Sequence, residues 1–95
     1  MKLSVYEISY PTESIVSAWS KENAYDIAHT EVDWCFFSTL AISFEKDCRM
    51  LEGDETFLVY EDDGTPQEWT PEKWLETHEE ACHIYTEPDS YPEAP

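Results

Sequence analysis

Positively charged residues are scarce in this sequence. Its 95 residues include 5 Lys and Arg against 22 Asp and Glu, which gives a formal net charge of −17. Binding DNA or RNA requires a basic patch that displaces counterions from the phosphates, and an anionic membrane surface would repel the chain. The composition therefore argues against nucleic acid or membrane as direct partners and favours a basic protein.

Glycine, cysteine and long apolar segments are also scarce. With two glycines, the chain is not dominated by loops. Its cysteines, Cys35, Cys48 and Cys82, are odd in number and lack a secretory signal, which argues against a disulfide scaffold. The longest apolar-rich run, residues 34–44, is too short to cross a bilayer. We therefore expect a reduced protein of the cytoplasm, or of the host cytoplasm if a phage encodes it.

Large apolar side chains, by contrast, are abundant. Hydrophobic residues make up 41% of the chain and aromatic residues 15%, a composition that disordered acidic segments do not have. The length suits one domain with a core of its own. We expect a single acidic domain over residues 1–85 and a flexible tail, rich in proline and acid, over residues 86–95.

Segments rich in β-branched and aromatic residues predict strands. They cover residues 3–10, 14–19, 34–45, 56–61 and, as a short strand, 67–70. The segment 34–45 is mostly uncharged on both faces, which indicates a central strand. Between the last two segments, Asp62-Asp63-Gly64 predicts a hairpin turn.

Start signals and apolar spacing predict two helices. Ser20 is placed to cap a helix over residues 21–31, and Thr70 followed by Pro71 opens a second helix over residues 71–84. The apolar stripe of the second helix is formed by Trp74, Leu75, His78, Ala81, Cys82 and Tyr85. The fold class is therefore α+β, a small antiparallel sheet of four to five strands packed with two helices.

The negative charge is concentrated in the second half of the chain. Residues 48–95 hold fourteen acids and two bases, against eight acids and three bases in residues 1–47. On the predicted second helix, acids recur at i, i+4, i+7 and i+8, namely Glu72, Glu76, Glu79 and Glu80. Residues four apart lie about 6 Å apart along a helix, close to the roughly 6 to 7 Å between successive phosphates of a DNA strand.

The hairpin turn can extend this row of charges. Glu61, Asp62 and Asp63 lie at or beside its tip, so the helix and the turn together can imitate a row of phosphates. The simpler interpretation is a solvated helix face and polar turns, which is what charge runs usually are. Ordinary solvated faces, however, mix lysine with glutamate, and this segment does not.

Two aromatic residues beside these acids are candidate contacts for a partner. Tyr60 precedes the acidic turn and Trp69 precedes the second helix. Tyrosine and tryptophan commonly anchor protein interfaces, and simple partial burial is the alternative.

Metal and catalytic sites have weaker support. His78 and Cys82 are four residues apart on the predicted helix, a spacing that suits two zinc ligands, but both also lie on its core stripe. Cys82 and His83 are adjacent, so their side chains would point about 100° apart and not form a nucleophile–base pair. We expect neither an enzyme nor a cofactor.

The acidic residues carry a resemblance to a functional class. The set Glu61, Asp62, Asp63, Glu72, Glu76, Glu79 and Glu80 resembles the charge placement of small acidic anti-defence proteins from phages and mobile elements, the anti-CRISPR and anti-restriction DNA mimics. The segment 17–24 also looks like the strand-into-helix start common in such proteins. The resemblance implies a stoichiometric inhibitor that occupies the basic nucleic-acid-binding surface of a CRISPR effector or restriction enzyme.

Two other functions stay open. The chain can instead be an interaction module or inhibitor that binds through an aromatic patch, away from the nucleic-acid path. The third hypothesis is a metal-binding or catalytic domain.

Overall fold

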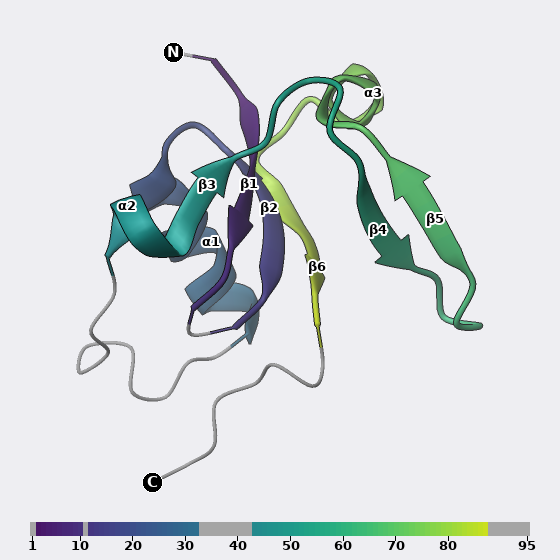
Figure 1. Ribbon diagram of the computed structural model, residues 1–95, viewed down its shortest axis with the longest axis horizontal. Coiled ribbons are helices and arrows are strands. Elements are labelled where there is room, and N and C mark those ends of the chain that lie inside the picture. Colours follow the sequence, from purple (N-terminus) through teal and green to yellow (C-terminus); the bar gives the residue numbers. More distant parts are fainter. Residues whose placement is uncertain (1, 11, 33–42, 88–95) are drawn as a thin grey trace, which may run out of the picture.

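The computed structural model describes residues 2–10, 12–32 and 43–87, and within them it contains two antiparallel sheets and three helices (Figure 1). In chain order the elements are β1 (Ser4–Ile8), β2 (Ser14–Ala18), α1 (Lys21–Val32), α2 (Phe44–Asp47), β3 (Cys48–Met50), β4 (Phe57–Tyr60), β5 (Pro66–Trp69), α3 (Pro71–Thr77) and β6 (Cys82–Thr86). This is the α+β fold that the sequence predicts.

The larger sheet has four strands in the order β3-β1-β2-β6, and every neighbouring pair is antiparallel. Its register places Glu7 of β1 opposite Ile15 of β2, and Ile15 opposite Tyr85 of β6. A bulge follows Ile15 in the pairing of β2 with β6. The second sheet is the β4–β5 hairpin, which stands beyond β6 in Figure 1.

Helix α1 covers one face of the larger sheet. It begins as expected at Ser20, whose Oγ accepts a hydrogen bond from the backbone N–H of Asn23 at 3.0 Å. The core beneath it contains small residues beside a few large ones: Tyr6, Ile8, Val16, Ala18, Ala24, Tyr25, Ala28 and Cys48. Tyr25 is almost fully buried and donates its hydroxyl to the carbonyl of Tyr10 at 3.0 Å.

The opposite face is covered by α3 and by the hairpin, through a core rich in aromatic rings. Its buried members are Val5, Leu51, Phe57 and Trp74, with Trp69 among the half-buried residues around them. The ring of Trp74 lies 6.2 Å from that of Phe57 and 5.0 Å from that of Trp69, both edge-on. Edge-on pairs at such distances are favourable beyond the area that they bury.

The second helix is shorter than the predicted 71–84. Thr70 caps it as expected, accepting from the N–H of Lys73, but α3 ends at Thr77. The Thr77 hydroxyl donates to the carbonyl of Trp74 at 3.1 Å, a local bond that competes with continued helix. Continuation would also place Glu79 and Glu80 near the negative end of the helix dipole.

The residues beyond α3 form a strand instead. β6 pairs with β2, and Ser17 fixes the junction by accepting from the N–H of Cys82 at 3.0 Å. The prediction that the apolar helix stripe continues over Ala81, Cys82 and Tyr85 is therefore wrong. Pairing with β2 provides hydrogen-bond partners for the backbone N–H and C=O groups of this segment, which the end of a helix would leave without partners.

The other predicted strands agree with the structure, apart from the segment 34–45. Residues 34–42 lie outside the described residues. Residues 44–47 form the short helix α2 and not the end of a strand, because Ser43 caps them: its hydroxyl accepts from the N–H of Lys46, and Asp47 Oδ2 accepts from the N–H of Ser43 at 2.9 Å.

The end of the sheet lies close to the predicted start of the tail. β6 extends to Thr86, and the N–H of Glu87 donates to the carbonyl of Glu13 at 2.8 Å. Residues 88–95 lie outside the described residues. Among the helices of the described residues, none is long and apolar enough to span a membrane.

Candidate protein-binding surface

The acidic tip, which we define as Glu61, Asp62 and Asp63, lies at the end of the hairpin where the sequence places it. Gly64 closes the turn with φ of 86°, a conformation that favours glycine, and donates to the carbonyl of Glu61 at 2.8 Å. The N–H of Thr65 donates to Asp63 Oδ1 at 2.9 Å, which holds the pKa of Asp63 below its usual value. All three acids are exposed, so the turn presents three carboxyl groups to solvent.

Two of the four predicted helix acids remain on a helix. Glu72 and Glu76 are exposed on α3, one turn apart. Glu79 and Glu80 are also exposed, but they lie in the segment between α3 and β6. The predicted row of four glutamates at phosphate-like spacing along one helix is therefore reduced to the single pair Glu72 and Glu76.

The acidic tip and α3 lie at opposite ends of the hairpin (Figure 1). β5 runs from the tip to α3 over four residues, Pro66–Trp69, or about 13 Å at roughly 3.3 Å per residue. The tip therefore does not extend the charges of α3 into one continuous row. The two sets of acids form separate surfaces.

The two predicted aromatic contacts have different surroundings. Tyr60 is 44% exposed at the end of β4, and its ring lies 5.7 Å from that of Tyr85. Trp69 is half-buried, with its ring edge-on to Trp74 and to His78, at 5.0 and 5.9 Å. Tyr60 is thus available to a partner, whereas Trp69 mainly joins the hairpin to α3.

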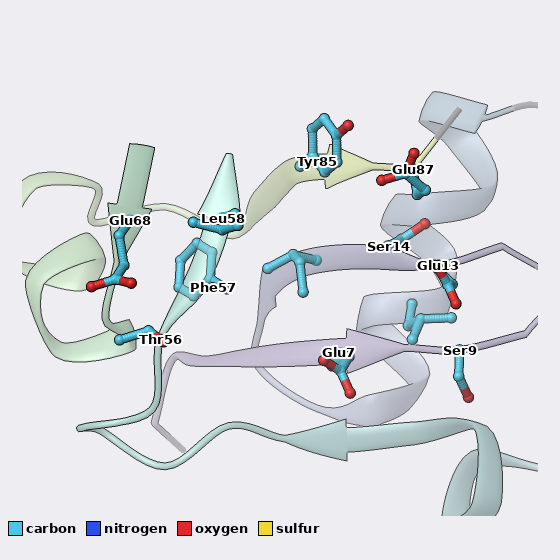
Figure 2. Close-up of a pocket in the computed structure, with 12 residues that line it drawn as sticks. Glu7, Ser9, Glu13, Ser14, Thr56, Phe57, Leu58, Glu68, Tyr85 and Glu87 are labelled. Carbon is cyan, nitrogen blue, oxygen red and sulfur yellow. The ribbon is translucent and has the colours of Figure 1, made fainter. Parts of the chain in front are cut away.

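A groove separates the hairpin from the open part of the larger sheet, and we call it the hairpin groove (Figure 2). Its volume is about 570 Å³. Four carboxylates line it, three from the larger sheet and its loops and one from the hairpin: Glu7, Glu13, Glu87 and Glu68. Apolar side chains lie between them, including Ile15, Phe57 and Leu58.

One arginine lies next to this groove. Arg49 of β3 is opposite Glu7 of β1 in the register, and its guanidinium lies 3.6 Å from Glu7 and 2.8 Å from Glu55. The bond from Arg49 holds the pKa of Glu55 below its usual value and raises that of Arg49. The chain thus uses its own guanidinium to bridge two carboxylates at the edge of the sheet.

The residues considered as metal ligands are drawn into packing. The His78 ring stacks on that of Trp74, with centroids 3.8 Å apart and planes 6° apart. Cys82 lies on β6, where its Sγ is 3.5 Å from the hydroxyl of Ser17. The two are therefore not four residues apart on one helix, and no group of three or more metal-binding side chains gathers within the described residues. Burial raises the pKa of the Cys48 thiol to about 11, so it stays protonated.

A chain of hydroxyl groups runs through the interior beside β6. Thr12, Ser14 and Thr86 are buried and hydrogen-bonded in series, with oxygen–oxygen distances of 2.8 and 2.9 Å, and the Thr86 hydroxyl also contacts the His83 ring. Burial lowers the pKa of His83. The arrangement links the β1–β2 loop to the end of β6.

No protein-family model, curated protein or solved structure matches the chain. Sequence reasoning located the acidic tip and Tyr60 but missed the hairpin groove. One signal was present: Phe57 and Leu58 are adjacent in a predicted strand, so apolar side chains lie on both of its faces and one of them has to face away from the core. The other wall depends on β6, part of which the sequence predicts as the end of the second helix.

Proposed function

We propose that this protein is a cytoplasmic, non-enzymatic inhibitor that binds stoichiometrically to the basic nucleic-acid-binding surface of another protein. Following the resemblance described above, we place this surface in a bacterial defence complex, a CRISPR effector or a restriction enzyme. The acidic protein would occupy the path of the nucleic acid and imitate its charge.

The acidic tip is the observation that carries the proposal. Its three exposed carboxylates lie on a turn held by backbone hydrogen bonds, at the end of a projecting hairpin. Within the described part of the chain, no lysine or arginine forms an ion pair with them. Negative charge that is fixed in place and unneutralised costs stability through self-repulsion, and a cationic partner would relieve that cost.

Glu72 and Glu76 on α3 offer a second negative surface. They retain the spacing of about 6 Å that one helical turn provides. Because they lie at the far end of the hairpin, the mimicry we propose uses two separate contacts on the target.

The alternative, inhibition away from the nucleic-acid path, is favoured by two exposed apolar side chains. Leu58 and Tyr60 are 45% and 44% exposed on β4. Residues two apart in a strand point to the same side, so they can form one patch. In that mode the patch and not the charge would dominate binding.

The test begins with capture of a partner from a bacterial lysate at low salt and its identification by mass spectrometry. The purified pair is then titrated at rising salt and with the partner's own nucleic acid. Mimicry predicts a steep loss of affinity with salt and direct competition with the nucleic acid. If a stable complex of all three components forms, mimicry is wrong.

A charge-matched pair of variants connects the result to the acidic tip. The tip variant carries Glu61→Gln, Asp62→Asn and Asp63→Asn. The control carries Glu22→Gln, Asp26→Asn and Glu45→Gln, three exposed acids on α1 and α2. We expect at least a tenfold loss of affinity for the tip variant and less than threefold for the control. A larger effect of Tyr60→Ala than of the tip variant would favour the alternative.

A further inference from the structure

The hairpin groove has the chemistry of a site for arginine side chains. We propose that it binds an extended, arginine-bearing segment of the partner protein, with guanidinium groups on its carboxylates and the aliphatic stems on its apolar floor. The inference rests on the proposed function, because it takes the partner to be a basic protein. It concerns a different surface, since the hairpin groove does not include the acidic tip.

One wall of the groove is formed by side chains that the strand register of β1, β2 and β6 places next to one another. Glu7, Ile15 and Tyr85 are neighbours across β1, β2 and β6, so their side chains form a row on one face of the larger sheet. This face is opposite the one that α1 covers, since Tyr6, Ile8 and Val16 point into the core below the helix. The row thus presents an acid, an aliphatic side chain and an aromatic ring in succession.

The hairpin supplies the other wall. Leu58 of β4 is directly opposite Glu68 of β5, so the two side chains lie on the same side of the hairpin. Leu58 is 45% exposed, and Glu68 forms no ion pair with any lysine or arginine of the described residues. Figure 2 shows Glu68 and Leu58 on the hairpin side and Glu7 across the groove.

An arginine side chain matches this alternation of apolar and acidic groups. Its stem buries well on apolar surface while its charged head stays at the rim. The planar guanidinium can bond a carboxylate with two parallel hydrogen bonds and can stack on an aromatic face, such as the ring of Tyr85 that lines the groove. The ammonium group of lysine is not planar and cannot form the same two parallel hydrogen bonds with a carboxylate.

The chain itself provides a precedent at the edge of the same face. Arg49 lies next to Glu7 in the same cross-strand row. Its Nη1 donates to both carboxylate oxygens of Glu55, at 2.8 and 3.1 Å, and its Nη2 lies 3.6 Å from Glu7. The row that lines the groove therefore already accommodates one guanidinium at its β3 end. An incoming arginine would take the position between Glu7 and Glu68.

The experiment uses the full chain and a fluorescein-labelled peptide of nine residues that alternates arginine with serine. Fluorescence anisotropy at 150 mM NaCl gives its affinity, and a lysine version of the same charge is the reference peptide. We expect the arginine peptide to bind at least fivefold more tightly. Equal affinities would overturn the proposal, since general attraction to an acidic protein does not distinguish the two cations. Failure of the arginine peptide to bind would overturn it as well.

Two matched pairs of variants locate the peptide. Glu68→Gln should weaken binding about fivefold, the loss of one charge-assisted contact at an exposed site. Its control, Glu22→Gln on α1, removes the same charge and should change affinity less than twofold. Leu58→Ser should weaken binding about threefold, whereas Met50→Ser, at a side chain 50% exposed on β3, should have little effect. Circular dichroism checks that each variant folds.

The possible outcomes separate this inference from the proposed function. If Glu68→Gln and Glu22→Gln weaken the peptide equally, or if only the tip variant does so, the groove is not the site, and the nucleic-acid competition assay is unaffected. If the groove variants weaken the peptide as expected but the captured partner keeps its nucleic acid, mimicry fails and the groove assignment stands.

Discussion

The two faces of the larger sheet are covered in different ways. On one face, Ala18, Ala24 and Ala28 are completely buried, and these small side chains let the backbone of α1 approach the strands closely. On the other face the contact is made by the rings of Phe57, Trp69 and Trp74. One face is closed by a helix of twelve residues, and the other by a helix of seven and a hairpin.

This difference explains where a surface for a partner can exist. A helix that fits closely over small residues leaves little room between its buried alanines and the strands that they contact. Large rings instead hold α3 and the hairpin above the sheet at a few points and leave the hairpin groove at the side. The comparison also predicts opposite sensitivities: the α1 face should be sensitive to enlargement, and the aromatic face to truncation.

The largest expected effect is that of Trp74→Ala. Trp74 contacts Phe57, Trp69 and His78, and its removal leaves a cavity where the hairpin and α3 meet. We expect the free energy of unfolding to fall by about 3 to 5 kcal/mol, measured by urea denaturation. In hydrogen exchange, the amides of β4 and β5 should lose protection before those of β1 and β2 do.

Two controls sharpen this prediction. Trp74→Phe should cost clearly less, because the buried Trp74 Nε1 has no hydrogen-bond partner within the described structure, so no such bond is lost. Trp19→Ala removes an indole that is 44% exposed and should be close to neutral. If Trp74→Ala destabilises β1 and β2 as much as the hairpin, the two faces do not act as separate units.

The next largest effect is expected from enlarging a residue on the α1 face. Ala28 is completely buried in the middle of α1, so Ala28→Leu forces the helix away from the sheet and should cost about 1 to 3 kcal/mol. Asp26→Leu places the same leucine side chain at an exposed position of the same helix and serves as the control. If Ala28→Leu leaves the urea midpoint unchanged, the contact is looser than we describe.

The same comparison shows what could be predicted from the sequence. Helix α1 was predictable because its signals are local: the Ser20 cap and alanines at helical spacing. The second helix began where Thr70 and Pro71 indicate, but its end depends on β2, which is more than fifty residues away in the sequence. Tertiary pairing overrode the local helical pattern there.

For the candidate surface, the division is similar. The acidic tip and Tyr60 belong to one hairpin, so a local turn signal was enough to find them. The hairpin groove brings together residues such as Glu7, Leu58 and Tyr85 from distant segments. Only the register of β1, β2 and β6 places these side chains on one face, and no spacing within a single segment contains that information.

A smaller effect is expected from removing the helix caps. Thr70→Ala and Ser20→Ala each delete a hydroxyl that accepts from a backbone N–H, at 3.2 and 3.0 Å, and each should cost about 1 kcal/mol. The location of the damage should differ. α3 has seven residues, so Thr70→Ala should increase hydrogen exchange throughout α3, whereas Ser20→Ala should affect only the first turn of the longer α1. Thr70→Ser, which keeps the hydroxyl, is the control.

The smallest effect concerns the pH dependence contributed by His83, which lines a shallow surface pocket together with Asp26 and Glu31 of α1. Burial lowers the pKa of His83 from 6.5, while Glu31 acts in the opposite direction. A folded-state pKa below the unfolded value means that the unfolded chain binds the proton more readily. The contribution of His83 to stability is therefore complete above about pH 6.5 and is lost as the pH falls toward the lower, folded-state pKa.

His83→Gln removes this titration and keeps a polar side chain near Thr86. We expect the urea midpoint of the wild-type protein to fall more steeply between pH 7.5 and 5.5 than that of the variant, since carboxylates such as Glu55 contribute equally to both. Parallel pH profiles would show that the pKa of His83 is the same in the folded and unfolded states, which would contradict this prediction. In that case the contact between the Thr86 hydroxyl and the His83 ring would hold β6 in place without making its stability depend on pH in this range.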